Sequence, residues 1–173
     1  MSSQITIRDE TAGDLEAIYS VNEQAFETNA EAELVDLLRM RVKAVISLVA
    51  EVDGVIVGHI LFSPVSLEPP ITNWKALGLA PLGVVPSYQR QGIGKALVKV
   101  GLERSKQLGI ALVVVLGHPS YYPKFGFKKA SERELANEYQ ADEAFMAIEL
   151  TPGILNNYKG LVKYAPEFNE LRF

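Results

Sequence analysis

The segment QRQGIG (89–94) combines two glycines with flanking positive charge, a pattern that suits the binding of an anion. It follows an apolar run and opens a segment with helical spacing, and Arg90 and Lys95 flank Gly92 and Gly94. Amide N–H groups at the start of a helix are unpaired and carry partial positive charge. Because glycine has no Cβ, an anion can approach this backbone closely. The segment therefore predicts a phosphate cradle.

Two nucleotide-binding motifs share this layout, and the sequence excludes both. A Walker A loop requires Gly-x4-Gly-Lys-Ser/Thr, but residue 89 is Gln and residue 96 is Ala. A dinucleotide fingerprint requires a third glycine at position 97, which is Leu. The two glycines by themselves leave one alternative open, a simple strand-to-helix turn with an exposed basic flank.

The surrounding sequence predicts the elements that would hold this segment. Valine- and isoleucine-rich runs on either side of Asp53-Gly54 predict a hairpin with strands at about 44–52 and 55–63. An apolar run at 75–85 predicts a strand with an edge, a bulge or a split at Pro81. Helical spacing continues from the cradle to a stop at Gly109, and the β-branched run at 110–116 predicts a strand buried on both faces. The other predicted elements are a strand at 4–8, a capping box at Thr11 and Asp14, helices that end at Phe26 and begin after Asn29, a loop at 67–75, an acidic loop at 132–143 and a strand at 143–150.

Length and composition bound the class of protein. The 173 residues predict one domain, residues 1–173, and a mixed α/β sheet with helices on both faces. A sequence without cysteine excludes a disulfide scaffold and a cysteine nucleophile, and two histidines give little support for a metal site. A net charge of −4 argues against nucleic-acid binding. No apolar run approaches the roughly 20 residues of a membrane span, and the N-terminus has no signal core, so we predict a cytoplasmic protein with no membrane partner.

Two motifs give the sequence a family resemblance. LGVVPSYQRQGIGKALV (82–98) is similar to motif A of the GNAT superfamily of N-acetyltransferases, with Gln89 at the first motif position. After the next predicted strand, YYPKFGF (121–127) matches the aromatic-Tyr-x-x-x-Gly-Phe element of the same superfamily. The resemblance covers nearly the whole chain, and VLGHPSYYPKFGF, FMAIELTPG and the KYAPEF-containing tail resemble the YhbS-like branch of predicted N-acetyltransferases. It implies a GNAT-like, mostly antiparallel twisted sheet that splays at its central strands.

The resemblance implies a binding site for acetyl-CoA on the cradle and on the strand before it. The pyrophosphate would lie on the backbone amides of the cradle, with only minor help from exposed cations. The pantetheine arm would pair with the strand like an added strand, since a bulge at Pro81 would leave backbone groups free. No metal is expected. The implied coenzyme contacts are Leu82, Gly83, Val84 and Val85 of the strand and Gln89, Arg90, Gln91, Gly92, Ile93, Gly94 and Lys95 of the cradle.

The resemblance also implies an acetyl-CoA-dependent N-acetyltransferase, in which a primary amine of a small molecule, a peptide or a protein attacks the thioester directly in a ternary complex. A lysine-like amine must first lose its proton, at a cost of about 4–5 kcal/mol at pH 7. His118, which follows the buried strand at 110–116, is the candidate base, and a backbone N–H such as that of Val84 is the candidate donor to the thioester oxygen. Tyr122 is the candidate acid for the departing thiolate, with simple ring packing as its alternative, while Tyr121 is expected in the core.

The sequence also leaves open several weaker candidates for site residues and two alternative functions. His59 is an alternative base or substrate contact, although strand parity does not show which face it occupies, and Glu51, Glu23 and Glu27 are equally typical of solvated carboxylates. The alternative functions are a non-catalytic acyl-CoA-binding sensor and a nucleotide-phosphate binder. The asparagine that most family members carry after the buried strand is absent, and GHP (117–119) leaves room for hardly a turn of helix. The acidic residues favour a cationic amine as acceptor, and the resemblance leaves a homodimer open.

Overall fold

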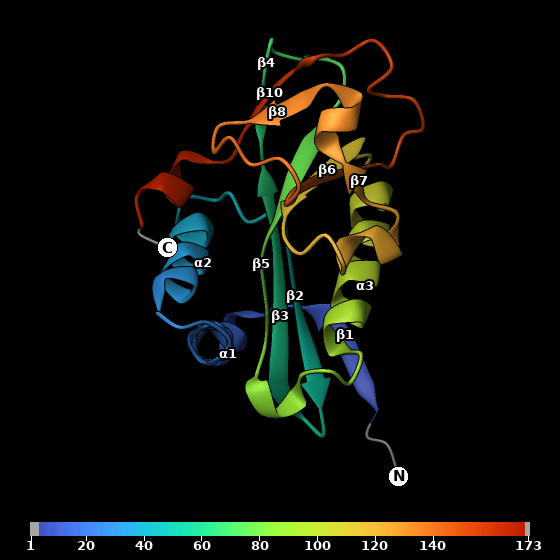
Figure 1. The fold of residues 1–173 in the computed structure, drawn as a ribbon. Helices are drawn as coiled ribbons and strands as arrows, with labels where there is room; N and C mark the ends of the chain where they lie inside the picture. The colour runs from blue at the N-terminus through green and yellow to red at the C-terminus, as the bar shows by residue number, and fades with distance from the viewer. Residues whose placement is uncertain (1–3, 172–173) are drawn as a thin grey trace. The chain divides into compact units, whose positions relative to one another are not determined.

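The structure, a computed structural model, describes residues 4–171 and contains two β-sheets and three α-helices within that range. The larger sheet has the strand order β1-β2-β3-β5-β6-β9-β7, and the smaller has the order β4-β10-β8 (Figure 1). The helices are α1 (Leu15–Ala25), α2 (Ala30–Met40) and α3 (Ile93–Gln107). The strands are β1 (Ile5–Asp9), β2 (Ile46–Val52), β3 (Val55–Pro64), β4 (Ser66–Glu68), β5 (Ala76–Val84), β6 (Leu112–Leu116), β7 (Lys128–Lys129), β8 (Leu135–Asn137), β9 (Phe145–Glu149) and β10 (Gly160–Lys163).

The chain divides into two compact units. Unit 1 comprises Met1–Phe62, Pro81–Gly101 and Pro166–Phe173, and unit 2 comprises Ser63–Ala80 and Leu102–Ala165. The elements β3, β5 and α3 each contribute residues to both units. The hairpin up to Phe62 and the glycine cradle therefore lie in unit 1, and the YYPKFGF segment lies in unit 2.

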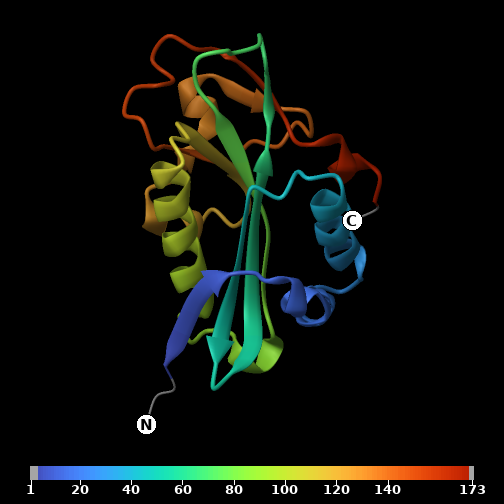
Figure 2. The ribbon, with the colours of Figure 1, turned by 180° about the vertical axis from the view of Figure 1, so that it is seen from behind.

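In unit 1, helices cover both faces of the strands. Figures 1 and 2 show α1 and α2 on one face of β2 and β3 and the first half of α3 on the other. Successive residues of β3 show this arrangement. A Cβ added to Gly58 would lie 3.0 Å from Ile93 of α3, whereas His59 hydrogen-bonds to Asn22 of α1. Neighbouring strand residues point to opposite faces, and the predicted helices on both faces are confirmed.

Two short structures that the local sequence predicted in unit 1, a hairpin turn and a capping box, are present. Asp53 and Gly54 have positive φ angles of 52° and 78°, as the two-residue turn of a type I′ hairpin requires. Ahead of α1, the Asp14 carboxylate accepts a hydrogen bond from the Thr11 backbone N–H at 2.7 Å, the reciprocal half of a capping box. The Arg8 guanidinium pairs with the same carboxylate and holds its pKa well below the usual range. The hairpin turn and the entry into α1 are thus both fixed by residues close to them in the sequence.

Unit 2 contains one feature that the sequence reasoning missed. The β-branched strand β6 is buried as predicted except at exposed Leu116, and it pairs in parallel with β5 and antiparallel with β9. The smaller sheet, however, forms from segments predicted as loops or left unassigned. β10 lies antiparallel to β4 and parallel to β8. The loop predictions at 67–75 and 132–143 are therefore wrong at β4 and β8, because the tail supplies the strand that pairs with both, with buried Leu67 opposite Val162.

Candidate active site

Strand β5 parts from β6 halfway along its length. The two strands pair in parallel only from Ala76 to Leu79 among the described residues, although β5 continues to Val84. Pro81, which has no N–H to donate, lies just beyond the last paired residue. The edge of β5 that faces β6 is therefore open at its C-terminal end. Of the alternatives predicted at Pro81, an edge, a bulge or a split, the structure shows a split.

The hydrogen bonds at the two ends of the β3–β5 pair indicate a β-bulge in β5. The Val65 N–H donates to the Ala76 carbonyl at 3.3 Å, and the Val85 N–H donates to the Val57 carbonyl at 2.9 Å. On the β3 side the two bonded residues are eight positions apart, whereas on the β5 side they are nine apart. One extra residue in β5 accounts for this difference. The bulge reverses which backbone groups of β5 face β3 beyond that point.

The end of β5 directs polar backbone groups away from β3. Because Val85 donates toward β3, the N–H and C=O of Val84 point to the opposite edge. The Val84 carbonyl accepts a hydrogen bond from the Gln89 side-chain amide at 2.9 Å. Leu82 and Val84 are half-buried, whereas Gly83 is buried. An extended group could pair with this edge as an added strand would.

The cradle that follows β5 has the backbone conformation of an anion site. Arg90 and Gly92 have positive φ angles of 62° and 86°, and no atom lies within 4 Å of a Cβ added to Gly92. The Ala96 N–H donates to the Gly92 carbonyl at 3.0 Å, so the amides of residues 93–95 precede the first bond between turns of α3. The positive φ of residue 92 favours glycine at this position. Gly94 has a different place, as the second residue of α3. The structure thus brings residues 82–95 together as one continuous strand-and-cradle segment within unit 1.

Tyr122 lies in unit 2 in a tightly packed aromatic turn. It begins a 3-10 turn that ends at Gly126, whose φ is 102°, so the predicted absence of a full helix here is confirmed. The ring meets Tyr121 and Phe127 edge-on, at centroid distances of 5.1 and 5.6 Å. A Cβ added to Gly117 would overlap the same ring. Burial raises the pKa of Tyr122 well above its usual value, with a further contribution from Tyr121, so the phenol keeps its proton at neutral pH.

His118 begins the same turn and is exposed. Its carbonyl accepts hydrogen bonds from the backbone N–H groups of Tyr121 and Tyr122, at 3.0 and 3.3 Å. The residue therefore helps to fix the turn through its backbone while its imidazole is open to solvent.

His59 is fully buried and belongs to a chain of hydrogen-bonded side chains that ends in half-buried groups. Nδ1 lies 3.2 Å from the amide nitrogen of Asn22, and Nε2 lies 2.8 Å from the hydroxyl of Ser47. Ser47 bonds in turn to Glu10, which accepts two hydrogen bonds from Arg39 at 2.7 and 2.9 Å. Burial lowers the pKa of His59 to about 3, and both ring nitrogens are engaged. The arrangement does not support the alternative of His59 as a base.

Proton positions in this chain follow from its partners. Asn22 can only donate through its amide nitrogen, so Nδ1 of His59 is the acceptor and Nε2 carries the hydrogen. Nε2 then donates to Ser47, whose hydroxyl donates to the carboxylate of Glu10. The serine proton is therefore directed away from the histidine, and the pair is not an activated nucleophile.

The weaker carboxylate candidates have ordinary surroundings. Glu51 accepts hydrogen bonds from Arg8 at 2.9 and 2.5 Å, which anchors β1 to β2. Glu23 and Glu27 are exposed.

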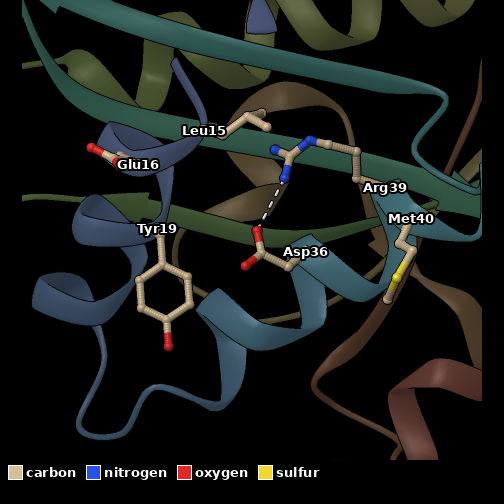
Figure 3. A pocket seen from close by; sticks show the side chains of 6 residues that line it. All are labelled: Leu15, Glu16, Tyr19, Asp36, Arg39 and Met40. Carbon is tan, nitrogen blue, oxygen red and sulfur yellow. Dashed lines mark hydrogen bonds and ion pairs between the residues drawn. The ribbon is translucent and has the colours of Figure 1, made fainter. Parts of the chain in front are cut away.

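Between α1 and α2 lies a cavity of about 510 Å³. Figure 3 shows side chains from both helices around it and the 3.1 Å ion pair of Arg39 with Asp36. Arg39 also belongs to the hydrogen-bonded chain described above. Sequence reasoning missed both the cavity and the chain, because their members come from separate elements and share no spacing. The cavity is lined by Leu15, Glu16, Tyr19, Asp36, Arg39 and Met40.

Residues 4–171 provide neither a metal site nor a helix that could span a membrane. No cluster of His, Cys, Asp or Glu there could hold a metal ion. None of the helices described is long and apolar enough to cross a membrane.

An α/β sheet with a splayed, bulged strand that leads into an anion cradle is the architecture of an acetyltransferase. The family profile described as "Acetyltransferase (GNAT) domain" matches residues 6–130, and the chain belongs to this family of N-acetyltransferases. The predicted fold class is confirmed.

Two relatives are similar over nearly the whole chain. YhbS of Escherichia coli K12, named an uncharacterized N-acetyltransferase, is 38% identical over 165 residues, which are 94% of this chain and 98% of YhbS. A crystal structure of E. coli YhbS with CoA matches with a TM-score of 0.92 at 36% identity, over 100% of this chain and 95% of that one. A GNAT acetyltransferase of Brucella melitensis with acetyl-CoA matches with a TM-score of 0.79 at 34% identity, over 96% and 99%. The resemblance to the YhbS-like branch is confirmed.

Proposed function

We propose that this protein is an acetyl-CoA-dependent N-acetyltransferase that transfers an acetyl group to a primary amine by direct attack in a ternary complex. The observation that carries the proposal is the continuous segment 82–95, in which an open strand edge runs straight into an anion cradle. Family membership supports the reaction type, and the CoA and acetyl-CoA in the two related crystal structures support the donor. Acetyl-CoA supplies an activated acyl thioester.

The residues of the segment fit this coenzyme. The cradle leaves the space over Gly92 open, and the first-turn amides of α3 provide donors for a pyrophosphate. We assign this role to the backbone of residues 89–95, with Arg90 and Lys95 adding little because both are exposed. We assign residues 82–85 to the pantetheine arm, since the edge of β5 beyond Leu79 is open.

We propose three roles in the transfer itself. The Val84 N–H, directed away from β3, donates to the thioester oxygen. Tyr122 returns a proton to the departing thiolate, and His118 takes the proton that the amine must lose. The raised pKa of Tyr122 makes it a weaker acid, but burial raises the proton affinity of a thiolate for the same reason. Donation between two buried groups therefore stays feasible.

Three broader predictions accompany this function. We propose that residues 1–173 act as one acetyltransferase domain, which the coverage of the YhbS structure supports. Cytoplasmic localisation stays a prediction that cell fractionation tests. Homodimer formation also stays a prediction, which light scattering on the purified protein tests.

The test is release of CoA at saturating acetyl-CoA with a panel of cationic, neutral and anionic primary amines. We expect acetyl-CoA binding by calorimetry and CoA release with at least one amine, most readily a cationic one. Binding without release on any amine would favour the sensor alternative. Competition of ATP with CoA for the cradle would favour the nucleotide-phosphate alternative.

A further inference from the structure

Helix α1 carries a buried side-chain carbonyl that has no hydrogen-bond partner. Asn22 is 0% exposed, and its amide nitrogen lies 3.1 Å from the Ile18 carbonyl and 3.2 Å from Nδ1 of His59. Its Oδ1 is buried without any partner among the described residues. Leaving a buried acceptor unpaired costs free energy, so such a group in a folded protein points to a ligand or to a constraint.

The unpaired oxygen faces β5 at Gly83. A Cβ added to Gly83 would lie 3.1 Å from Oδ1 of Asn22, 3.2 Å from Cβ of Ala25 and 3.4 Å from Cε2 of Phe26. Gly83 directly precedes Val84, within the end of β5 that has parted from β6. The carbonyl of Asn22 therefore points at the stretch of strand to which we assign the thioester end of the coenzyme.

The orientation of this amide is fixed. Rotating it by 180° would turn the oxygen toward the Ile18 carbonyl, which cannot donate, and toward Nδ1 of His59, which carries no hydrogen in the chain through Ser47. Both contacts would become repulsive. The hydrogen-bonded chain behind His59 thus holds the Asn22 carbonyl against β5.

We propose that Asn22 Oδ1 accepts a hydrogen bond from the attacking amine and so orients it toward the thioester; this inference rests on the proposed function. A primary amine keeps N–H groups while its lone pair attacks, and its nitrogen gains positive charge as the N–C bond forms and the C–S bond breaks. A carbonyl oxygen is suited to both changes. Oδ1 is buried, so the amine can reach it only if neighbouring side chains move aside. Phe26, half-buried and first after α1, is one such neighbour, because its ring lies at the same position over Gly83.

The experiment compares two rates of each variant at saturating acetyl-CoA: CoA release with ethylamine and CoA release by water alone. Ethylamine is the probe because it offers little besides the reacting amine. The ratio of the two rates does not depend on how much of a variant is folded. For Asn22→Leu, and for Asn22→Ala should the leucine variant fold poorly, we expect the ratio to fall about 10-fold to 100-fold, the loss of one hydrogen bond to a charged group. Ser63→Ala is the matched control, because Ser63 Oγ in β3 is also buried and has no hydrogen-bond partner within residues 4–171. Its ratio should not change.

The outcomes separate this inference from the function on which it rests. An unchanged ratio in the Asn22 variants, or an equal loss of both rates, would overturn the amine contact and leave the acetyltransferase function standing, since an equal loss means that Asn22 only positions β5. If the unmodified protein binds acetyl-CoA but releases CoA with no amine, the proposed function itself fails and the inference fails with it.

Discussion

Lowering the pH from 7 to 5 should destabilise the fold by about 2 kcal/mol through His59 alone. The folded protein holds this imidazole neutral, with a pKa lowered to about 3 by burial, whereas an unfolded histidine has a pKa of about 6.5. Between these values the unfolded chain binds more protons than the native one. The stabilisation is therefore complete above pH 6.5 and declines as the pH falls toward 3.

The magnitude follows from proton uptake by the unfolded state. Unfolded histidine is roughly one quarter protonated at pH 7 and almost fully protonated at pH 5, and each pH unit at full uptake is worth about 1.4 kcal/mol. Two charged groups near the ring also affect its pKa through their charges. Glu10 raises the pKa of His59 and Arg39 lowers it, both less than burial does. Although burial raises the pKa of Glu10, its hydrogen bonds from Arg39 and Ser47 outweigh that effect and keep it ionised.

The assay is urea unfolding at pH 7, 6 and 5, with His59→Gln as the reference, because glutamine does not titrate and all other groups are common to both proteins. The unmodified protein should lose about 2 kcal/mol more than the variant between pH 7 and 5. Equal losses in the two proteins would refute the conclusion that the imidazole is buried and neutral.

The remaining predictions concern the proposed site. Tyr122→Phe should lower the turnover number about 100-fold or more, as loss of a general acid does, with the dissociation constant of acetyl-CoA unchanged; Tyr121→Phe should not, and equal turnover in both would remove the acid role. Gly92→Ala and Gly54→Ala should each cost roughly 1–2 kcal/mol of stability, since both glycines have positive φ and open space around them. Only Gly92→Ala should weaken acetyl-CoA binding in calorimetry, and matched affinities would argue against the cradle.

Features that depend on neighbours in sequence could be predicted. The Asp53-Gly54 turn, the cradle at 89–95 and the split at Pro81 each arise from the backbone freedom or missing donor of particular residues. The aromatic turn at Tyr122 was recognisable from its resemblance to the family's aromatic-Tyr-x-x-x-Gly-Phe element, and the structure gives its Gly126 a φ of 102°. The resemblance of segments 82–98 and 121–127 to family motifs indicated the family and the acetyl donor.

Features that depend on contacts between residues far apart in the sequence could not be predicted. The smaller sheet needs β10 to pair with segments earlier in the chain, and three- or four-residue strands leave too little alternation to detect. The face occupied by His59 was undetermined because β3 is buried on both faces, so its sequence does not alternate. Asn22 gave no signal at all, since its importance lies in the contact of its oxygen with Gly83.

The overlap between a side chain at Gly117 and the ring of Tyr122 has an evolutionary consequence. Neither position can be exchanged freely, because any Cβ at 117 requires the ring at 122 to shrink or to move. We expect the two positions to covary among homologous sequences, with glycine at the first wherever tyrosine occupies the second. The short turn would then be inherited as a unit, and a lineage that lengthened it would have to rebuild its aromatic cluster at the same time.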